Sequence, residues 1–126
     1  MTHIAKGHIA RGHIVRFGIN PPPAEMGRPD NIVAGNPETL LQNYYTDQGN
    51  QFFAGVWECT PGKWRVSYAE EEFCAILEGK AILTDAAGNS ETVKTGDAFV
   101  IPKGFAGTWE TVQKVRKWYV IFEPKG

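Results

Sequence analysis

The segment from Gly96 to Glu110 reads Gly-Asp-Ala-Phe-Val-Ile-Pro-Lys-Gly-Phe-Ala-Gly-Thr-Trp-Glu. A short apolar run, residues 98–101, lies between two turn signals, Gly96-Asp97 and Pro102-Lys103-Gly104. Glycine and proline at these places interrupt regular structure, and an apolar run of this length is long enough for one strand. The segment therefore predicts a short β-strand held between two tight turns.

The same succession of short runs and turns continues through the chain from Gln51 onward. The runs are rich in aromatic and β-branched residues, and no long segment has a 3.6-residue period. In the last run, Val115, Lys117, Tyr119 and Ile121 fall on one face of a strand. Short strands at this spacing are typical of a β-sandwich or barrel. The predicted strands are residues 52–58, 63–68, 73–77, 80–84, 92–94, 98–101, 107–111 and 114–123, with turns at Pro61-Gly62, Glu78-Gly79 and Ala87-Gly88-Asn89 among others.

The first fifty residues have a different character, because proline and glycine interrupt them repeatedly. Residues 13–17 and 31–33 are typical of short strands, and residues 39–45 of a helical turn. A chain of 126 residues is long enough for one hydrophobic core. We therefore expect one domain, in which residues 1–50 form an extended N-terminal arm that packs on a barrel core formed by residues 51–126.

Composition and charge argue against several classes of protein. Hydrophobic residues make up 42% of the chain and charged residues 21%, as in a globular protein. The formal net charge of −1 provides no basic field to attract nucleic acid. No apolar run reaches the roughly 20 residues of a membrane helix, and no signal-peptide core is present. Cys59 and Cys74 form neither a disulfide framework nor a zinc pattern, so we expect reduced thiols and a cytoplasmic location.

All three histidines lie in a five-residue repeat near the N-terminus, at His3, His8 and His13. On a strand, an odd spacing places successive histidines on opposite faces. On a helix, each step of five residues rotates the side chain by about 140°. Neither geometry brings the three imidazoles to one ion, so we interpret the repeat as a flexible or edge-pairing arm.

Two blocks of sequence carry a family resemblance. The first, residues 60–79, places Glu72 seven positions before Gly79, and the second, residues 96–104, reads G-D-A-F-V-I-P-K-G. They resemble the two motifs of the cupin superfamily. The first motif has a glycine, two histidines, a glutamate and a glycine, and the second reads G-D-x4-P-x-G followed by a histidine. The resemblance implies an all-β fold, the cupin double-stranded β-helix or jelly-roll barrel.

The resemblance is closer to one group, the (S)-ureidoglycine aminohydrolase-type cupins, over about residues 52–123. That group has a tryptophan before P-G, a glutamate followed by F-C, and later G-D-x-F, G-F, G-T-W-E and R-K-x-Y. Because cupins support many unrelated chemistries, the match implies a fold and a group rather than a reaction. The matching residues are Trp57, Pro61-Gly62, Glu72-Phe73-Cys74, Gly96-Asp97-Ala98-Phe99, Gly104-Phe105, Gly107-Thr108-Trp109-Glu110 and Arg116-Lys117-Trp118-Tyr119.

The histidine positions of the cupin motifs hold other residues in this chain. These positions fall at Val66, Tyr68 and Gly107, and only Glu72 retains a metal-ligand type. A single carboxylate binds a divalent transition metal weakly. The resemblance therefore implies a cupin without its usual metal, and we expect no bound cofactor.

Strand alternation places a mixed set of aromatic and polar side chains inside the predicted barrel. Such a set is typical of a ligand pocket in which a few polar groups converge. Glu72 beside Lys117, with Tyr68 as a hydrogen-bond donor, would form an ion pair or an acid/base couple. A purely structural salt bridge from Glu72 to Lys117 or Arg65 is the alternative. The candidate ligand-binding residues are Trp57, Tyr68, Glu72, Cys74, Trp109, Lys117 and Tyr119.

Three functions are compatible with this sequence. The first is a metal-independent cupin that binds a small polar metabolite in its barrel. The second is a metal-dependent hydrolase resembling the ureidoglycine aminohydrolases, with a divalent metal such as manganese. The third is a structural or regulatory module whose barrel is packed shut. We expect a small-molecule partner rather than nucleic acid or a membrane, and a homodimer, because sheet edges and the β-branched N-terminal arm favour pairing.

Overall fold

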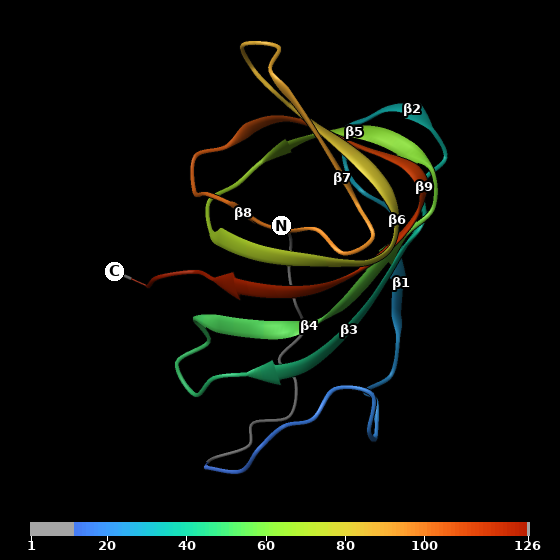
Figure 1. Ribbon diagram of the computed structural model, residues 1–126. Coiled ribbons are helices and arrows are strands. Elements are labelled where there is room, and N and C mark those ends of the chain that lie inside the picture. The colour runs from blue at the N-terminus through green and yellow to red at the C-terminus, as the bar shows by residue number, and fades with distance from the viewer. Residues whose placement is uncertain (1–11, 126) are drawn as a thin grey trace.

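A computed structural model describes residues 12–125 of the chain. This part is all-β and curled into a barrel-like shape (Figure 1), which confirms the predicted jelly-roll class. No helix long and apolar enough to cross a membrane occurs among the described residues. The strands are β1 (Glu25–Gly27), β2 (Ile32–Gly35), β3 (Thr39–Thr46), β4 (Phe52–Cys59), β5 (Gly62–Ser67), β6 (Glu71–Asp85), β7 (Ser90–Lys94), β8 (Ala98–Ile101) and β9 (Ala106–Phe122).

These strands pair in the order β1-β3-β4-β9-β5-β2, and β6 pairs with β7, β8 and β9. All of the pairings are antiparallel. The first part of β9 pairs with β5 and its last part with β4, while β6 pairs with it along both parts. β9 therefore joins β4, β5 and β6 into one curled sheet, and its inward-facing side chains lie near the centre of the barrel interior.

The alternation predicted for the last strand is confirmed. The odd-numbered residues from Val115 to Ile121 are buried, and the residues between them are less so. The predicted break near residue 112 is wrong, however, because β9 is one strand of 17 residues. Lys80 pairs with Gln113 across this point, so the ladder of hydrogen bonds continues where two strands were expected.

A bulge, rather than the predicted turn, occurs at Glu78-Gly79 within β6. The register between β6 and β9 shifts between Ile76 and Ala81. An extra residue reverses which positions face inward, so β6 buries Cys74 and Ile76 before the bulge and Ala81 after it. Gly79 has a φ of +94°, and a Cβ there would lie 2.0 Å from the carbonyl oxygen of Lys114. The bulge therefore requires glycine at this position.

Residues 39–46 form the strand β3, and the predicted helical turn is wrong. β3 pairs with β4 from Thr39–Cys59 to Thr46–Phe53, and β1 pairs with its other edge. Hydrogen bonds along both edges outweigh the weak helical preference of so short a segment. β3 and β4 lie on either side of residue 50, so both parts of the chain contribute strands to one sheet.

Residues 13–17 are not a strand, which corrects another expectation, whereas β2 confirms the one predicted near residue 32. Gly12 and Gly18 both have left-handed φ values, and the chain bends or turns at residues 12–13 and 17–20, at the two ends of the segment. The segment contacts the barrel through a ring instead: Phe17 stacks on Tyr44 at 4.7 Å and packs on Trp118 at 5.2 Å. His3 and His8 lie outside the described residues.

The hydrophobic core fills the interior of the curled sheet. Its members come from β4, β5, β6, β7, β8 and β9, so residues distant in sequence pack together. Aromatic residues supply much of its volume, and each of them buries a large area. The largest fully buried apolar side chains are Trp109, Tyr119, Ile101, Ile121, Val56 and Val115.

Candidate functional site

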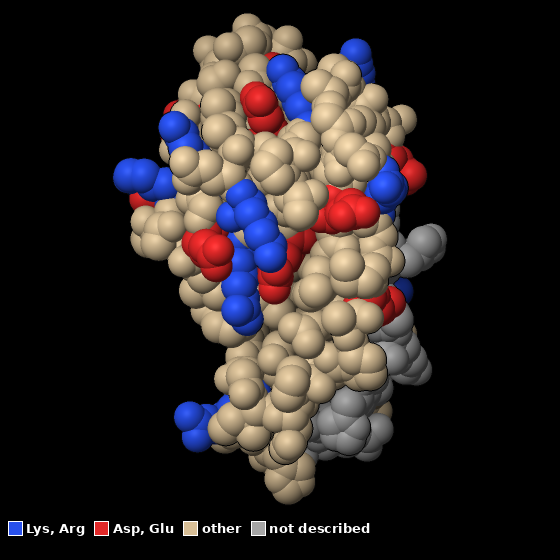
Figure 2. Space-filling model, turned by 90° about the vertical axis from the view of Figure 1, so that its right-hand side faces the viewer, with Lys and Arg blue, Asp and Glu red and all other residues tan. Residues whose placement is uncertain are grey.

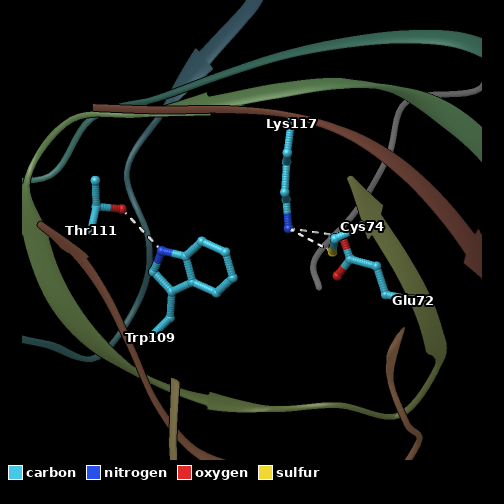
Figure 3. Close-up of polar contacts among 5 residues, drawn as sticks. All are labelled: Glu72, Cys74, Trp109, Thr111 and Lys117. Carbon is cyan, nitrogen blue, oxygen red and sulfur yellow. Dashed lines mark hydrogen bonds and ion pairs between the residues drawn. The ribbon is translucent and has the colours of Figure 1, made fainter. Parts of the chain in front are cut away.

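The ammonium of Lys117 lies inside the barrel, where β9 points it across to β6 (Figure 3). Its Nζ donates a hydrogen bond to Oε2 of Glu72 at 3.0 Å and another to Sγ of Cys74 at 3.3 Å. The side chains of Lys117 and Glu72 are 4% and 0% exposed, so the pair is shielded from water. The ion pair predicted between Glu72 and Lys117 is therefore present, and Arg65 is not part of it.

Tryptophan rings surround this ammonium. Nζ of Lys117 lies 4.7 Å from the ring centroid of Trp57 and 4.6 Å from that of Trp109, which are cation–π distances. Trp57 meets Trp109 edge to face at 5.5 Å, and Trp64 packs on both. The indole N–H of Trp109 donates to Thr111 at 2.9 Å, which fixes the plane of that ring (Figure 3).

Trp64 is a site residue that the candidate set derived from the sequence does not include. It lies on β5, four residues before Tyr68, which directly follows that strand, and the even spacing is consistent with both side chains being buried. The alternation in the run Lys63-Trp64-Arg65-Val66-Ser67-Tyr68 carries this signal. Inward residues could therefore have been counted back from Tyr68 to Trp64.

A pocket of about 320 Å³ opens beside the ammonium. Four candidate residues line it, namely Trp57, Tyr68, Trp109 and Lys117. Glu72 and Cys74 do not line it, because they lie behind the ammonium on β6. The pocket is thus apolar on its walls and carries a cation in its lining, the composition of a small-molecule site.

The mouth of the pocket is formed partly by residues 28–31, which sequence reasoning did not place at the site. These residues connect β1, which pairs with β3, to β2, which pairs with β5. The connection therefore spans from one side of the curled sheet to the other. Arg65 donates its backbone N–H to the carbonyl oxygen of Asn31 at 3.1 Å and holds one end of the span.

Tyr119 lies inside the barrel as predicted, but it does not line the pocket. Its hydroxyl donates to Oδ1 of Asn43 at 2.7 Å, and the amide of Asn43 donates to Thr46 at 2.8 Å. All three residues are buried. These bonds satisfy the polar groups of Tyr119 and Asn43 and link β9 to β3.

The two thiols retain their protons at neutral pH. Burial raises the pKa of Cys74 to about 12, although the ammonium of Lys117 opposes the shift. Burial likewise raises the pKa of Cys59 to about 11. Since the thiolate is the nucleophile, neither cysteine is activated for covalent catalysis.

Lys117 and Tyr68, which line the pocket, also retain their protons. Burial lowers the pKa of Lys117, but its attraction to Cys74 and Glu72, together with hydrogen bonds to both, outweighs burial, so the pKa is raised. Burial, and then the negative charge of Glu72, raise the pKa of Tyr68 well above its usual value. The pocket therefore presents an ammonium and a neutral phenol.

The arrangement does not fit the metal of ordinary cupins. Val66, Tyr68 and Gly107 stand where the motifs have histidines, and valine and glycine have no ligand atoms on their side chains. In the described part of the chain, no three His, Cys, Asp or Glu side chains gather into a group that could hold a metal ion. An ammonium contacts Glu72, the remaining ligand type, so this carboxylate already has a cation.

One oxygen of Glu72 has no partner. Oε2 accepts from Lys117, while Oε1 is buried without a hydrogen-bond partner among the described residues. A buried acceptor without a donor costs free energy. The carboxylate is therefore held in place by its ammonium rather than by a full set of hydrogen bonds.

Charges on the outer surface are of both signs. On the face drawn in Figure 2, basic and acidic side chains are interspersed. Glu58, for example, lies 3.4 Å from Lys114 and 3.9 Å from Arg116. Such exposed pairs contribute little to stability. The buried Lys117–Glu72 pair is a different case, because water screens it far less.

Comparison with protein families gives one match. The family described as EutQ-like cupin domain matches residues 46–119, more than half of the chain. The matched span begins at the last residue of β3 and ends in β9, so it includes Trp57, Glu72 and Lys117. No curated protein matches the chain.

Solved structures give further likenesses. A candidate ethanolamine utilization protein Q from Salmonella typhimurium is 25% identical, with a TM-score of 0.64 over 79% of this chain and 80% of that one. A DUF861 family protein from Thermotoga maritima is 34% identical, with a TM-score of 0.50 over 51% of this chain and 73% of that one. A DUF861 family protein of unknown function from Pseudomonas syringae pv. tomato is 24% identical, with a TM-score of 0.68 over 90% of this chain and 46% of that one, and shows the fold alone.

Proposed function

The chain belongs to the EutQ-like cupin domain family, and from this premise we propose that it binds a small polar metabolite in the pocket of its barrel. One observation carries the proposal: the protonated ammonium of Lys117 lies in the lining of a tryptophan-walled pocket of about 320 Å³. The walls supply apolar contact, and the ammonium and the phenol of Tyr68 supply orientation. The volume suits a small molecule rather than a peptide.

The buried charges support a binding role over a purely structural one. An ion pair in a low-dielectric interior is often no more stabilising than apolar residues of the same volume. A barrel built only for stability would therefore gain little from Lys117 and Glu72. A pocket that must orient a polar ligand gains a fixed charge from them, and this favours binding over a barrel that is packed shut.

Nothing in the described residues favours the metal-dependent hydrolase. That hypothesis needs a divalent ion, and the ligand positions hold Val66, Tyr68 and Gly107. The kinship with the (S)-ureidoglycine aminohydrolase-type cupins remains a proposal about the group. It rests on Trp57 and on the Glu72-Phe73-Cys74 run, and it does not imply that this chain catalyses the reaction of that group.

A thermal-shift screen of small metabolites tests the proposal, using protein first dialysed against EDTA. A ligand that binds only the native state, at 100 times its Kd, stabilises the fold by about 2.7 kcal/mol. For a domain of this size the melting temperature then rises by several degrees. The matched variants are Val66→Phe, which adds a ring to the pocket lining, and Val112→Phe on the outer surface.

We expect a ligand found in the screen to stabilise the wild-type protein and Val112→Phe equally, and Val66→Phe much less. Equal stabilisation of all three proteins would place the ligand elsewhere on the molecule. A broad screen without any stabilising metabolite would favour the closed structural module instead.

A further inference from the structure

The ammonium of Lys117 has one N–H group without an acceptor among residues 12–125. An ammonium carries three N–H groups, and Glu72 and Cys74 accept two of them. Lys117 also lines the pocket, so a ligand there can reach the third N–H. The protein thus presents a fixed positive charge with an unused hydrogen bond at the wall of a small pocket.

The tryptophan walls do not select a cationic ligand. A ring of aromatic side chains commonly recognises an ammonium by cation–π contact. Here the rings of Trp57 and Trp109 already contact an ammonium, the one on Lys117, at 4.7 and 4.6 Å. A second cation in the pocket would meet the like charge of Lys117 at short range and would be repelled.

The charged residues of the pocket lining, taken together, also favour an anionic ligand over a cationic one. Arg28, Arg65 and Lys117 are the cationic residues of the lining, and Asp30 is its one anionic residue among those described. Arg28 lies 3.5 Å from Glu38, which partly neutralises it. Glu72 likewise pairs with Lys117, so the charges nearly balance overall, but the charged residues that line the pocket itself are mostly positive, and this favours an anion over a cation.

Resting on the proposed function, we infer that the ligand is a small organic acid whose carboxylate meets Lys117, so that an internal ammonium provides the positive charge that a metal provides in other cupins. One carboxylate oxygen accepts a hydrogen bond from the third N–H of Lys117, and the side chain of Tyr68 lines the same pocket. The apolar part of the acid packs on Trp57, Trp64 and Trp109. A flat body suits this wall, because aromatic faces pack well on one another.

Glu72 contacts the ammonium of Lys117 without lining the pocket, and its charge affects how strongly the pocket binds an anion. Its carboxylate shares the ammonium with the ligand, and it weakens the attraction of the pocket for an anion. Removing that negative charge while keeping the side-chain shape therefore strengthens the binding of an acid. A merely structural Glu72 would not produce such a gain, so the effect separates the two roles.

The experiment compares three probes of nearly equal shape: benzoate, neutral benzamide and cationic benzylamine. Binding of each to the EDTA-treated full chain is measured by titration calorimetry at pH 7.5. We expect benzoate to bind at least tenfold more tightly than benzamide, and benzylamine to bind least. Addition of 5 mM EDTA during the titration leaves the affinity for benzoate unchanged, because no metal takes part.

Three variants complete the design. Glu72→Gln is expected to bind benzoate several-fold more tightly, and the matched surface variant Glu91→Gln as tightly as the wild type. The charge-neutral double variant Lys117→Met/Glu72→Leu loses the preference for benzoate over benzamide. Circular dichroism establishes which variants are folded, and the double variant keeps the inference testable if Glu72→Gln does not fold.

Each result decides between the two proposals. If benzamide or benzylamine binds as tightly as benzoate, the carboxylate inference is wrong, although the pocket still binds small molecules. If benzoate binds equally well to the double variant, Lys117 is not the anchor and the inference is likewise wrong. If none of the probes binds and the metabolite screen also finds nothing, the proposed function fails with it.

Discussion

At the scale of single residues, the barrel depends on a charge pair that is almost completely shielded from bulk water. Lys117 and Glu72 lie on neighbouring strands, and their side chains meet at 3.0 Å with almost no exposed surface. Breaking such a pair leaves one uncompensated charge in an apolar interior. The two residues are therefore coupled in their effect on stability.

We predict that Glu72→Ala lowers the free energy of unfolding by about 3 kcal/mol, because the ammonium of Lys117 loses its counter-charge. The double variant Lys117→Met/Glu72→Leu removes both charges and is expected to lose less than half as much. Urea unfolding followed by tryptophan fluorescence measures both. A double variant as unstable as Glu72→Ala would show that packing, rather than charge, dominates here.

The buried thiols predict how stability depends on alkaline pH. The pKa of Cys74 is about 12 in the folded protein, against 9.0 for an unperturbed thiol. The native thiol keeps its proton longer than the unfolded one, so unfolding releases a proton above pH 9 and the free energy of unfolding falls as pH rises. The contribution is complete below pH 9 and is lost by about pH 12.

Cys74→Ala is the variant that tests this dependence. We expect the decline in unfolding free energy between pH 9 and 11 to become shallower by about 1.4 kcal/mol per pH unit, the slope of one titrating group. Urea titrations at several pH values measure the slope. Identical slopes in the variant and the wild type would contradict the assignment.

At the scale of elements, β6 and β9 show what an alternating pattern can and cannot predict. The alternation in β9 predicts Lys117 and Tyr119 on the inward face, because side chains alternate strictly along an unbroken strand. In β6, Gly79 suggests a turn, although the chain continues through a bulge. Glycine permits both, and the partner strand that decides between them is remote in sequence.

The site shows the same limit. Glu72 and Lys117 can be paired from the sequence, since a motif marks one and alternation marks the other. The contribution of residues 28–31 to the pocket mouth cannot be predicted in this way. It depends on which strands β1 and β2 pair with, and these pairings are long-range.

Gly79→Ala tests the bulge, and Gly88→Ala is its matched control. Both glycines have nearly the same left-handed φ, +94° and +90°, but a Cβ at Gly88 meets no atom within 4 Å. We expect Gly88→Ala to cost about 1 kcal/mol from backbone strain alone. Gly79→Ala adds a clash with Lys114 and should cost more than about 3 kcal/mol. Equal losses in chemical denaturation would contradict this account.

At the scale of the whole molecule, an apolar area remains on the outside of the barrel. Phe73 lies opposite Val100 on one side and Val120 on the other, and Phe52 lies opposite Phe122. Phe52, Phe73, Val100 and Phe122 are all exposed. Exposed apolar side chains grouped in this way are typical of an interface, and they support the homodimer predicted from the sequence.

We predict that Phe73→Glu converts a dimer into a monomer, because it places a charge within this outer apolar area. The control is Val33→Glu on the edge strand β2, which is also exposed but lies on a different strand. Light scattering at micromolar concentration measures the mass of each. A dimer that survives Phe73→Glu but dissociates with Val33→Glu would place the interface at the sheet edge.

The pairing of β9 with β4, β5 and β6 has a consequence for folding during synthesis on the ribosome. β4, β5 and β6 emerge before β9, and each depends on β9 for a long ladder of hydrogen bonds. Contacts between residues so far apart in sequence make folding slow. The nascent chain therefore exposes unpaired strands until Ala106–Phe122 has been synthesised, and chaperones have the most to protect in that interval. Trp109 and Lys117 arrive with the same strand, so the barrel and its pocket are completed in one step.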